Sequence, residues 1–126
     1  MTTTIFVCIS CQREGQDDDA LDRPGRALVQ TLEAHRQEHG QASFAVAGVD
    51  CLAVCKRPCT VALCGAGKWT YLIGDIDPNV HAREIIAAAQ SFAASENGIV
   101  PWRERPQSFR KGVIARVPPL SHRKLQ

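Results

Sequence analysis

Six cysteines are the residues of this 126-residue chain best suited to chemistry. Four of them form two close pairs: two residues separate Cys8 from Cys11, and three separate Cys51 from Cys55. Paired thiolates bind zinc or iron–sulfur clusters, or carry out thiol–disulfide exchange. In a reducing compartment, clustered cysteines serve these roles more often than they form structural disulfides. These four cysteines are therefore the candidate site.

The segments around the two pairs have alternating strand and helix patterns. Continuous apolar runs over residues 4–9 and 43–49 predict two buried strands, and start and stop signals predict a helix over 24–40 between them. A strand–helix–strand order predicts a parallel pair with a right-handed crossover. Each cysteine pair comes at the end of one of these strands, so we expect both pairs at one edge of the sheet, where ligand sites of α/β folds form.

Two more strands and a helix complete the expected domain. Residues 60–64 and 69–73 flank a glycine-rich loop and predict an antiparallel hairpin. Apolar side chains recur at helical spacing over 82–92, and Asp77 with Pro78 is expected to begin this helix. The order β-α-β-β-β-α predicts a small thioredoxin-like α/β domain with a mixed sheet over residues 1–96.

The last thirty residues have a different composition. Residues 95–126 contain seven Lys and Arg against two acidic residues, whereas residues 1–94 contain eight against eleven. Four prolines in this part predict that no regular element forms. Trp102 and Phe109 argue against full solvation, so we expect residues 97–126 to be a basic arm that packs back on the domain or contacts a partner. No recognition module accompanies the charge, which disfavours nucleic-acid binding.

The overall composition excludes several classes of protein. The chain is 44% hydrophobic and 22% charged, as folded soluble domains are. Its apolar runs are much shorter than the ~20 residues of a membrane span, and the N-terminus lacks a basic leader with a long apolar stretch. We therefore expect a cytoplasmic protein without a membrane partner. There is no phosphate-binding glycine motif, so we expect no nucleotide site, and the histidines have no metal-binding spacing near the cysteines. No substrate pocket is implied, so we do not expect an enzyme.

The unequal spacing of the cysteine pairs bears on the kind of centre. Structural zinc sites usually have two tight, glycine-rich Cys-x-x-Cys turns, whereas the residues between Cys51 and Cys55 are apolar. A [2Fe–2S] cluster has two irons with two cysteines each, which accommodates unequal pairs. Lys56 and Arg57 would offset its negative charge, or they serve surface solubility. A zinc-binding structural or metallochaperone module with the same four ligands is the alternative.

A thiol–disulfide oxidoreductase that uses Cys8 and Cys11 is a further alternative. A reactive Cys-x-x-Cys pair normally has its first thiol at the N-terminus of a helix. Here a polar segment with three consecutive aspartates follows the pair. This alternative is therefore less well supported than a metal centre.

The cysteine segment also resembles a known group of proteins. Residues 51–63, followed by Trp69-Thr-Tyr71, are similar to the second half of the thioredoxin-like [2Fe–2S] ferredoxins, whose pattern is Cys-Leu-Gly-x-Cys, a proline, an apolar strand and a Trp/Tyr strand. The whole chain, including 101–106 and 110–116, also resembles a bacterial family of uncharacterised predicted metal-binding proteins often associated with cobalamin-related genes. The resemblance implies an electron carrier or a cluster-binding accessory protein with an unknown redox partner, and it leaves a homodimer open.

By position, Cys51 and Cys55 match the second ligand pair of these ferredoxins, and Cys8 matches the first ligand. The ferredoxins space their first pair more widely than Cys8 and Cys11, so the resemblance leaves the fourth ligand open. The expected ligands of a [2Fe–2S] cluster, or of zinc, are Cys8, Cys11, Cys51 and Cys55.

The two remaining cysteines, Cys59 and Cys64, are the candidates to replace Cys11. Cys59 continues the four-residue repeat of Cys51 and Cys55, which keeps a [4Fe–4S] centre as a minor alternative. Cys64 ends a predicted strand and is better explained as a small buried hydrophobic residue.

Overall fold

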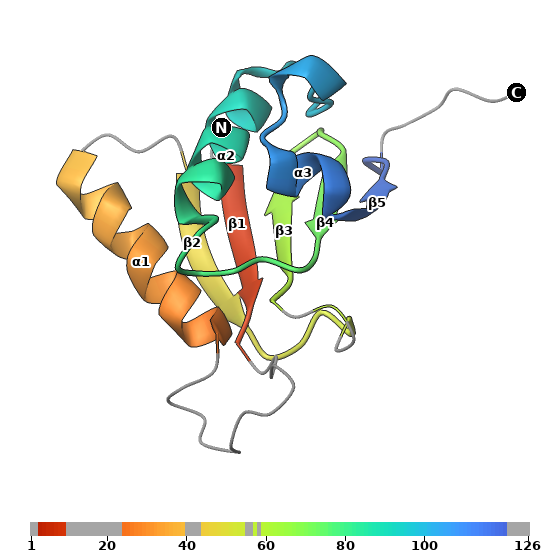
Figure 1. Cartoon of the computed structure of the whole chain (residues 1–126). Helices are drawn as coiled ribbons and strands as arrows, with labels where there is room; N and C mark the ends of the chain where they lie inside the picture. The colour runs from red at the N-terminus through yellow and green to blue at the C-terminus, as the bar shows by residue number, and fades with distance from the viewer. Residues whose placement is uncertain (1–2, 10–23, 40–43, 55–56, 58, 121–126) are drawn as a thin grey trace, which may run out of the picture.

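The computed structural model describes residues 3–9, 24–39, 44–54, 57 and 59–120. Three helices lie side by side over one face of a five-stranded sheet (Figure 1). None of the described helices is both long and apolar enough to cross a membrane. The elements are β1 (Thr3–Cys8), α1 (Pro24–His39), β2 (Phe44–Val49), β3 (Val61–Cys64), β4 (Thr70–Ile73), α2 (Ala82–Ala94), the 3-10 helix η2 (Trp102–Glu104), α3 (Gln107–Lys111) and β5 (Val113–Val117).

The sheet has the strand order β2-β1-β3-β4-β5. β1 and β2 are parallel, with Thr3 opposite Phe44 and Cys8 opposite Val49. β3, β4 and β5 are each antiparallel to the preceding neighbour in the sheet. The predicted parallel pair, the hairpin and the mixed sheet are therefore confirmed.

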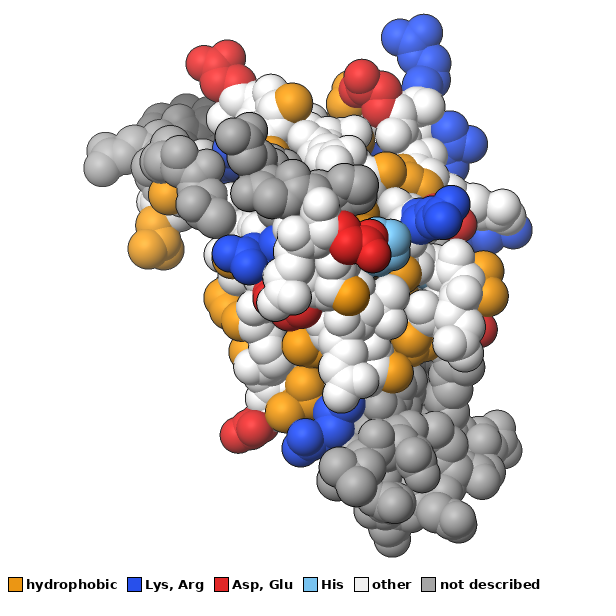
Figure 2. All heavy atoms as spheres, turned by 90° about the vertical axis from the view of Figure 1, so that its left-hand side faces the viewer, with side chains coloured by type: hydrophobic (Ala, Val, Ile, Leu, Met, Phe, Trp, Pro, Cys, Tyr) orange, Lys and Arg blue, Asp and Glu red, His pale blue; other side chains and the backbone are white. Residues whose placement is uncertain are grey.

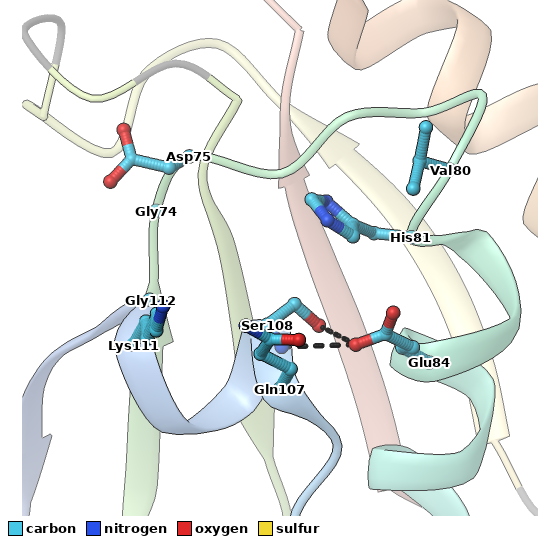
Figure 3. Close-up of a pocket in the computed structure, with 9 residues that line it drawn as sticks. All are labelled: Gly74, Asp75, Val80, His81, Glu84, Gln107, Ser108, Lys111 and Gly112. Carbon is cyan, nitrogen blue, oxygen red and sulfur yellow. Dashed lines mark hydrogen bonds between the residues drawn. The ribbon is translucent and has the colours of Figure 1, made fainter.

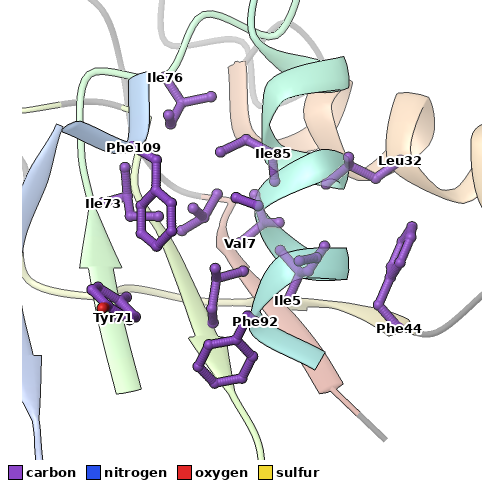
Figure 4. Packing of buried hydrophobic residues seen from close by; sticks show 14 of the residues in the cluster. Ile5, Val7, Leu32, Phe44, Tyr71, Ile73, Ile76, Ile85, Phe92 and Phe109 are labelled. Atoms are coloured by element: carbon purple, nitrogen blue, oxygen red, sulfur yellow. The ribbon is translucent and has the colours of Figure 1, made fainter. Parts of the chain in front are cut away.

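The core lies between this sheet and the helices. Alternate side chains of β1, β3 and β4 point to the helices, because successive residues of a strand face opposite sides. They meet Leu28 and Leu32 of α1, Ile85 and Phe92 of α2 and Phe109 of α3, all of which are fully buried (Figure 4). Burying a side chain of this size stabilises the fold by about 1.5–3 kcal/mol. The side of the molecule that carries α1 mixes acidic, basic and hydrophobic side chains (Figure 2), as an amphipathic surface helix does.

Helix α2 begins later than its sequence suggested. Asp77 and Pro78 were expected to start it, but residues 77–81 form a separate turn, and His81 precedes the first helical residue. The side chain of Asp77 accepts the N–H of Asn79 at 2.9 Å, and Nδ1 of His81 accepts the N–H of Asp77 at 2.8 Å. At the other end, Nζ of Lys68 donates to the carbonyls of residues 92 and 93, which satisfies part of the helix C-terminus.

The prediction that the arm contains no regular element was wrong. Pro101 and Pro106 are the N-cap residues of two short helices, where the fixed φ of proline fits the extended backbone and its missing N–H removes no helical hydrogen bond. Phe109 of α3 inserts into the core, edge-on to Tyr71 with ring centroids 4.8 Å apart. β5 then pairs with β4 and extends the sheet. The arm through residue 117 therefore packs on the domain as its fifth strand and third helix.

Arg105 holds this part of the chain in place. Its guanidinium lies 5.3 Å from the ring centres of Tyr71 and Phe109 and 5.6 Å from that of Trp102. It also donates hydrogen bonds to the carbonyl of Val100 at 2.7 Å and to the hydroxyl of Tyr71 at 3.1 Å. This arginine of the basic arm therefore serves packing rather than a free positive surface.

Candidate metal centre

The end of β1 delivers Cys8 to the edge of the sheet at which β2 also ends. Cys8 is opposite Val49 in the last rung of the parallel pair, and Cys51 follows two residues later. The N–H of Cys8 donates to the carbonyl of Thr60, and that of Ile9 donates to Val49, both at 3.0 Å. Both neighbouring strands therefore fix the end of β1. β1 and β2 end at the same edge of the sheet (Figure 1), which places Cys8 and Cys51 at the common edge that the sequence predicted, whereas Cys11 and Cys55 lie outside the described residues.

Gly25 brings the start of α1 directly onto this edge. A Cβ atom at Gly25 would collide with the carbonyl of Cys8 and lie 2.9 Å from Cα of Ile9. A residue with a side chain would push the helix off the end of β1. The close approach leaves Cys8 only 1% exposed.

The loop after β2 provides a hydrogen-bond donor for the second cysteine. Sγ of the exposed Cys51 accepts the N–H of Ala53 at 3.1 Å. Ala53 has φ +63°, a left-handed conformation that costs an L-residue about 1–2 kcal/mol. Hydrogen bonds to cysteine sulfur stabilise thiolates and tune the potentials of iron–sulfur clusters. The strained turn therefore fits a metal-binding thiolate.

Arg57, which was expected to offset the charge of a cluster, has a carboxylate partner. Its Nε and Nη2 atoms each lie 2.8 Å from Oδ2 of Asp75. The positive charge of Arg57 is therefore compensated within the protein. Lys56 lies outside the described residues.

The two spare cysteines occupy different places. Cys64 is opposite Thr4, four residues from Cys8 along β1, which is about 13 Å at the usual rise of a strand. Burial raises the pKa of the Cys64 thiol, and a hydrogen bond with Thr70 partly counters this. Cys59 is fully buried in the core cluster, and its backbone exchanges two hydrogen bonds with Ile76, of 3.3 and 3.0 Å. Cys64 is therefore too far away to share a centre with Cys8, and Cys59 packs as a core residue.

A pocket of about 350 Å³ lies beside this edge, between residues 74–75, the start of α2 and α3 (Figure 3). Oε1 of Glu84 accepts hydrogen bonds from the N–H and the hydroxyl of Ser108, at 2.9 and 2.8 Å. The backbone hydrogen bond from Ser108, more than any other cause, lowers the pKa of Glu84, although partial desolvation opposes it. No cysteine lines the described walls of the pocket. No sequence pattern predicted this pocket, because Glu84 and Ser108 are 24 residues apart.

Comparison with known proteins gives a family and a structural neighbour. The model of a family described as "Protein of unknown function (DUF1636)" matches residues 5–119. The chain belongs to the DUF1636 family. No curated protein matches it. Its structure is similar to that of a thioredoxin-like [2Fe–2S] ferredoxin from Aquifex aeolicus, with a TM-score of 0.62 and 17% identity over 96% of this chain and 97% of that chain. The predicted resemblances to an uncharacterised family and to the ferredoxin fold are confirmed.

Two of the four predicted ligands of this DUF1636 protein can thus be located. Cys8 and Cys51 lie at one edge, and the segments that contain Cys11 and Cys55 follow them along the chain. Among the described residues, no three His, Cys, Asp or Glu side chains are grouped so that they could hold a metal ion. The full ligand set therefore stays a prediction.

Proposed function

We propose that this DUF1636 protein is a ferredoxin-like [2Fe–2S] protein that carries electrons or serves as a cluster-binding accessory protein. The observation that carries the proposal is the position of Cys8 and Cys51, which the parallel β1–β2 pair delivers to one edge of a thioredoxin-like sheet. The ferredoxin with the similar fold is named for a [2Fe–2S] cluster, which supports the same cofactor here. The proposed ligands are Cys8, Cys11, Cys51 and Cys55.

The residues at this edge fit such a group. Cys51 is exposed, with a backbone N–H directed at its sulfur, and Cys8 is shielded by α1. A bound cluster supplies one-electron transfer, and the chain supplies thiolates, burial on one side and access on the other. This role needs no substrate pocket, so we propose a redox protein rather than an enzyme.

The burial of Cys8 argues against thiol–disulfide exchange. An exchanging thiol must be reached by the disulfide it attacks, and Cys8 is only 1% exposed. A zinc centre would use the same four thiolates and would give a colourless protein without a redox response. Metal and sulfide analysis separates zinc from a cluster.

Single cysteine variants test the ligand set. Cys8→Ser and Cys51→Ser should lose iron, sulfide and visible colour, and they should melt at lower temperature, because a bound centre stabilises the folded state that holds it. Cys64→Ser is the matched control, since Cys64 of β3 lies opposite Thr4 at the start of β1, away from Cys8. The Cys64→Ser protein should keep the full cluster. A Cys51→Ser protein with its full iron and sulfide content would overturn the assignment. Equal melting temperatures with and without the centre would refute the coupling to folding.

A further inference from the structure

The backbone of Arg57 joins the cysteine loop to the segment after β4. Its N–H donates to the carbonyl of Val54 at 3.1 Å, which holds together the chain on both sides of residues 55–56. Its carbonyl accepts the N–H of Asp75 and the hydroxyl of Thr60, both at 3.1 Å. One residue therefore joins Val54, at the end of the described part of the cysteine loop, to Thr60 and Asp75.

The side chain of Arg57 extends this connection to the C-terminal arm. Besides its two 2.8 Å contacts with Asp75, Nη2 lies 3.5 Å from the carbonyl of Lys111 at the end of α3. The N–H of Gly74 donates to the carbonyl of Gly112 at 2.8 Å. A Cβ at Gly74 would come within 2.9 Å of Ile114 and 3.0 Å of Cβ of Arg57. Residues 74–75 therefore contact both the arm and the cysteine loop. Arg57, which follows that loop, contacts Asp75 and the arm.

The charge of Arg57 does not explain this arrangement. The guanidinium and the carboxylate of Asp75 form a neutral pair, so their combined field at the cysteines is small compared with that of a lone arginine. The pair is also partly exposed, with side-chain exposures of 35% and 56%, so its contribution to the free energy of unfolding is small. The contacts of Arg57 therefore bear on the position of the cysteine loop rather than on its electrostatic environment.

We propose that Arg57 is a positioning residue of the cysteine centre, which acts through Asp75 to hold the loop of Cys51 and Cys55 in its binding conformation. This inference rests on the proposed function, because it requires that the four cysteines hold a metal or cluster. It also gives the C-terminal arm a role, because the carbonyls of Lys111 and Gly112 accept hydrogen bonds from Arg57 and Gly74 and so support the pair that holds the loop.

Two single variants separate positioning from charge. Arg57→Gln removes a positive charge, and Asp75→Asn removes a negative one. If Arg57 acted on the cluster by its charge, the first would speed release of iron to a chelator and the second would slow it, because an unpaired Arg57 would attract the anionic cluster more strongly. If the pair positions the loop, both variants break the same contact, and both should speed release of iron to a chelator by about tenfold, the usual effect of losing a supporting contact of a metal ligand. Arg103→Gln is the control, because the side chain of Arg103 is exposed and makes no hydrogen bond or ion pair with the described residues of this loop.

The assay measures chelator release and the melting temperature of the metal-free protein for each variant. We expect faster release from both Arg57→Gln and Asp75→Asn, release from the double variant no faster than from the faster single variant, and unchanged melting. Slower release from Asp75→Asn, or wild-type release rates in both variants, would overturn the inference while leaving the iron-binding proposal intact. If the wild-type protein holds zinc, zinc release gives the same comparison and the cluster proposal alone fails. A wild-type protein without any metal would overturn both.

Discussion

Replacing Ala53 by glycine should stabilise the protein although it removes a side chain. Ala53 has φ +63°, where an L-residue is about 1–2 kcal/mol less stable than in its preferred regions. Glycine avoids this cost but loses about 0.5–1 kcal/mol through the greater freedom of the unfolded chain. The expected gain in the free energy of unfolding is therefore about 0.5–1 kcal/mol. The Ala53 N–H that donates to Cys51 is kept, so metal content should not change.

Urea unfolding of the metal-free protein measures this gain without interference from a bound centre. The matched control is Ala87→Gly, the same change at an exposed position inside α2, which should cost about 1 kcal/mol. The two substitutions should therefore shift the midpoint in opposite directions. An Ala53→Gly protein that loses as much stability as the α2 control would refute the claim that the cysteine loop contains a strained turn.

Three further outcomes test other parts of the structure. The hydrogen bonds from Ser108 lower the pKa of Glu84. The ionised carboxylate therefore stabilises the fold above its ordinary pKa and loses that effect as the pH falls through the lowered value. Glu84→Gln should unfold more easily than wild type at pH 7, and the difference in stability should shrink below about pH 4.3. Arg105→Lys should cost about 1–2 kcal/mol in urea unfolding, since lysine keeps the charge but loses the planar stacking and the paired hydrogen bonds. In the metal-free protein, iodoacetamide should modify the exposed Cys51 faster than Cys64, because burial raises the pKa of the Cys64 thiol and limits access to it.

Matched surface residues serve as controls for these tests. Glu96→Gln and Arg103→Lys should have almost no effect on unfolding at pH 7, because both side chains are exposed. A constant difference between Glu84→Gln and wild type from pH 7 to pH 3 would contradict the proposed role of the Ser108 contact. Equal effects of the Arg105 and Arg103 changes would show that the aromatic contacts of Arg105 add nothing. Equal labelling rates of the two cysteines would contradict their different environments.

The sequence was informative where local pattern decides the structure. The sequence predicted both ends of β1 and of β2 to within one residue. The ends of these two strands in turn located Cys8 and Cys51. These features depend on periodicity and on the direction of neighbouring strands, both of which are present in the sequence itself.

The rest depends on contacts between distant residues. The start of α2 moved because the side chain of His81 accepts a backbone N–H, which competes with the expected cap. The arm forms helix and strand because Phe109 is buried in the core and the guanidinium of Arg105 packs on three aromatic rings. The pairing of Arg57 with Asp75, 18 residues away, likewise has no signal in either segment alone.

The central claim is that the cysteine edge holds an iron–sulfur cluster, and one measurement tests it most directly. The full chain is purified without oxygen, and its visible spectrum is recorded together with iron, sulfide and zinc analysis of the same sample. The account predicts a red-brown protein with about two irons and two sulfides per chain, bleached by reduction. A colourless protein with one tightly held zinc, or with no metal, would contradict it.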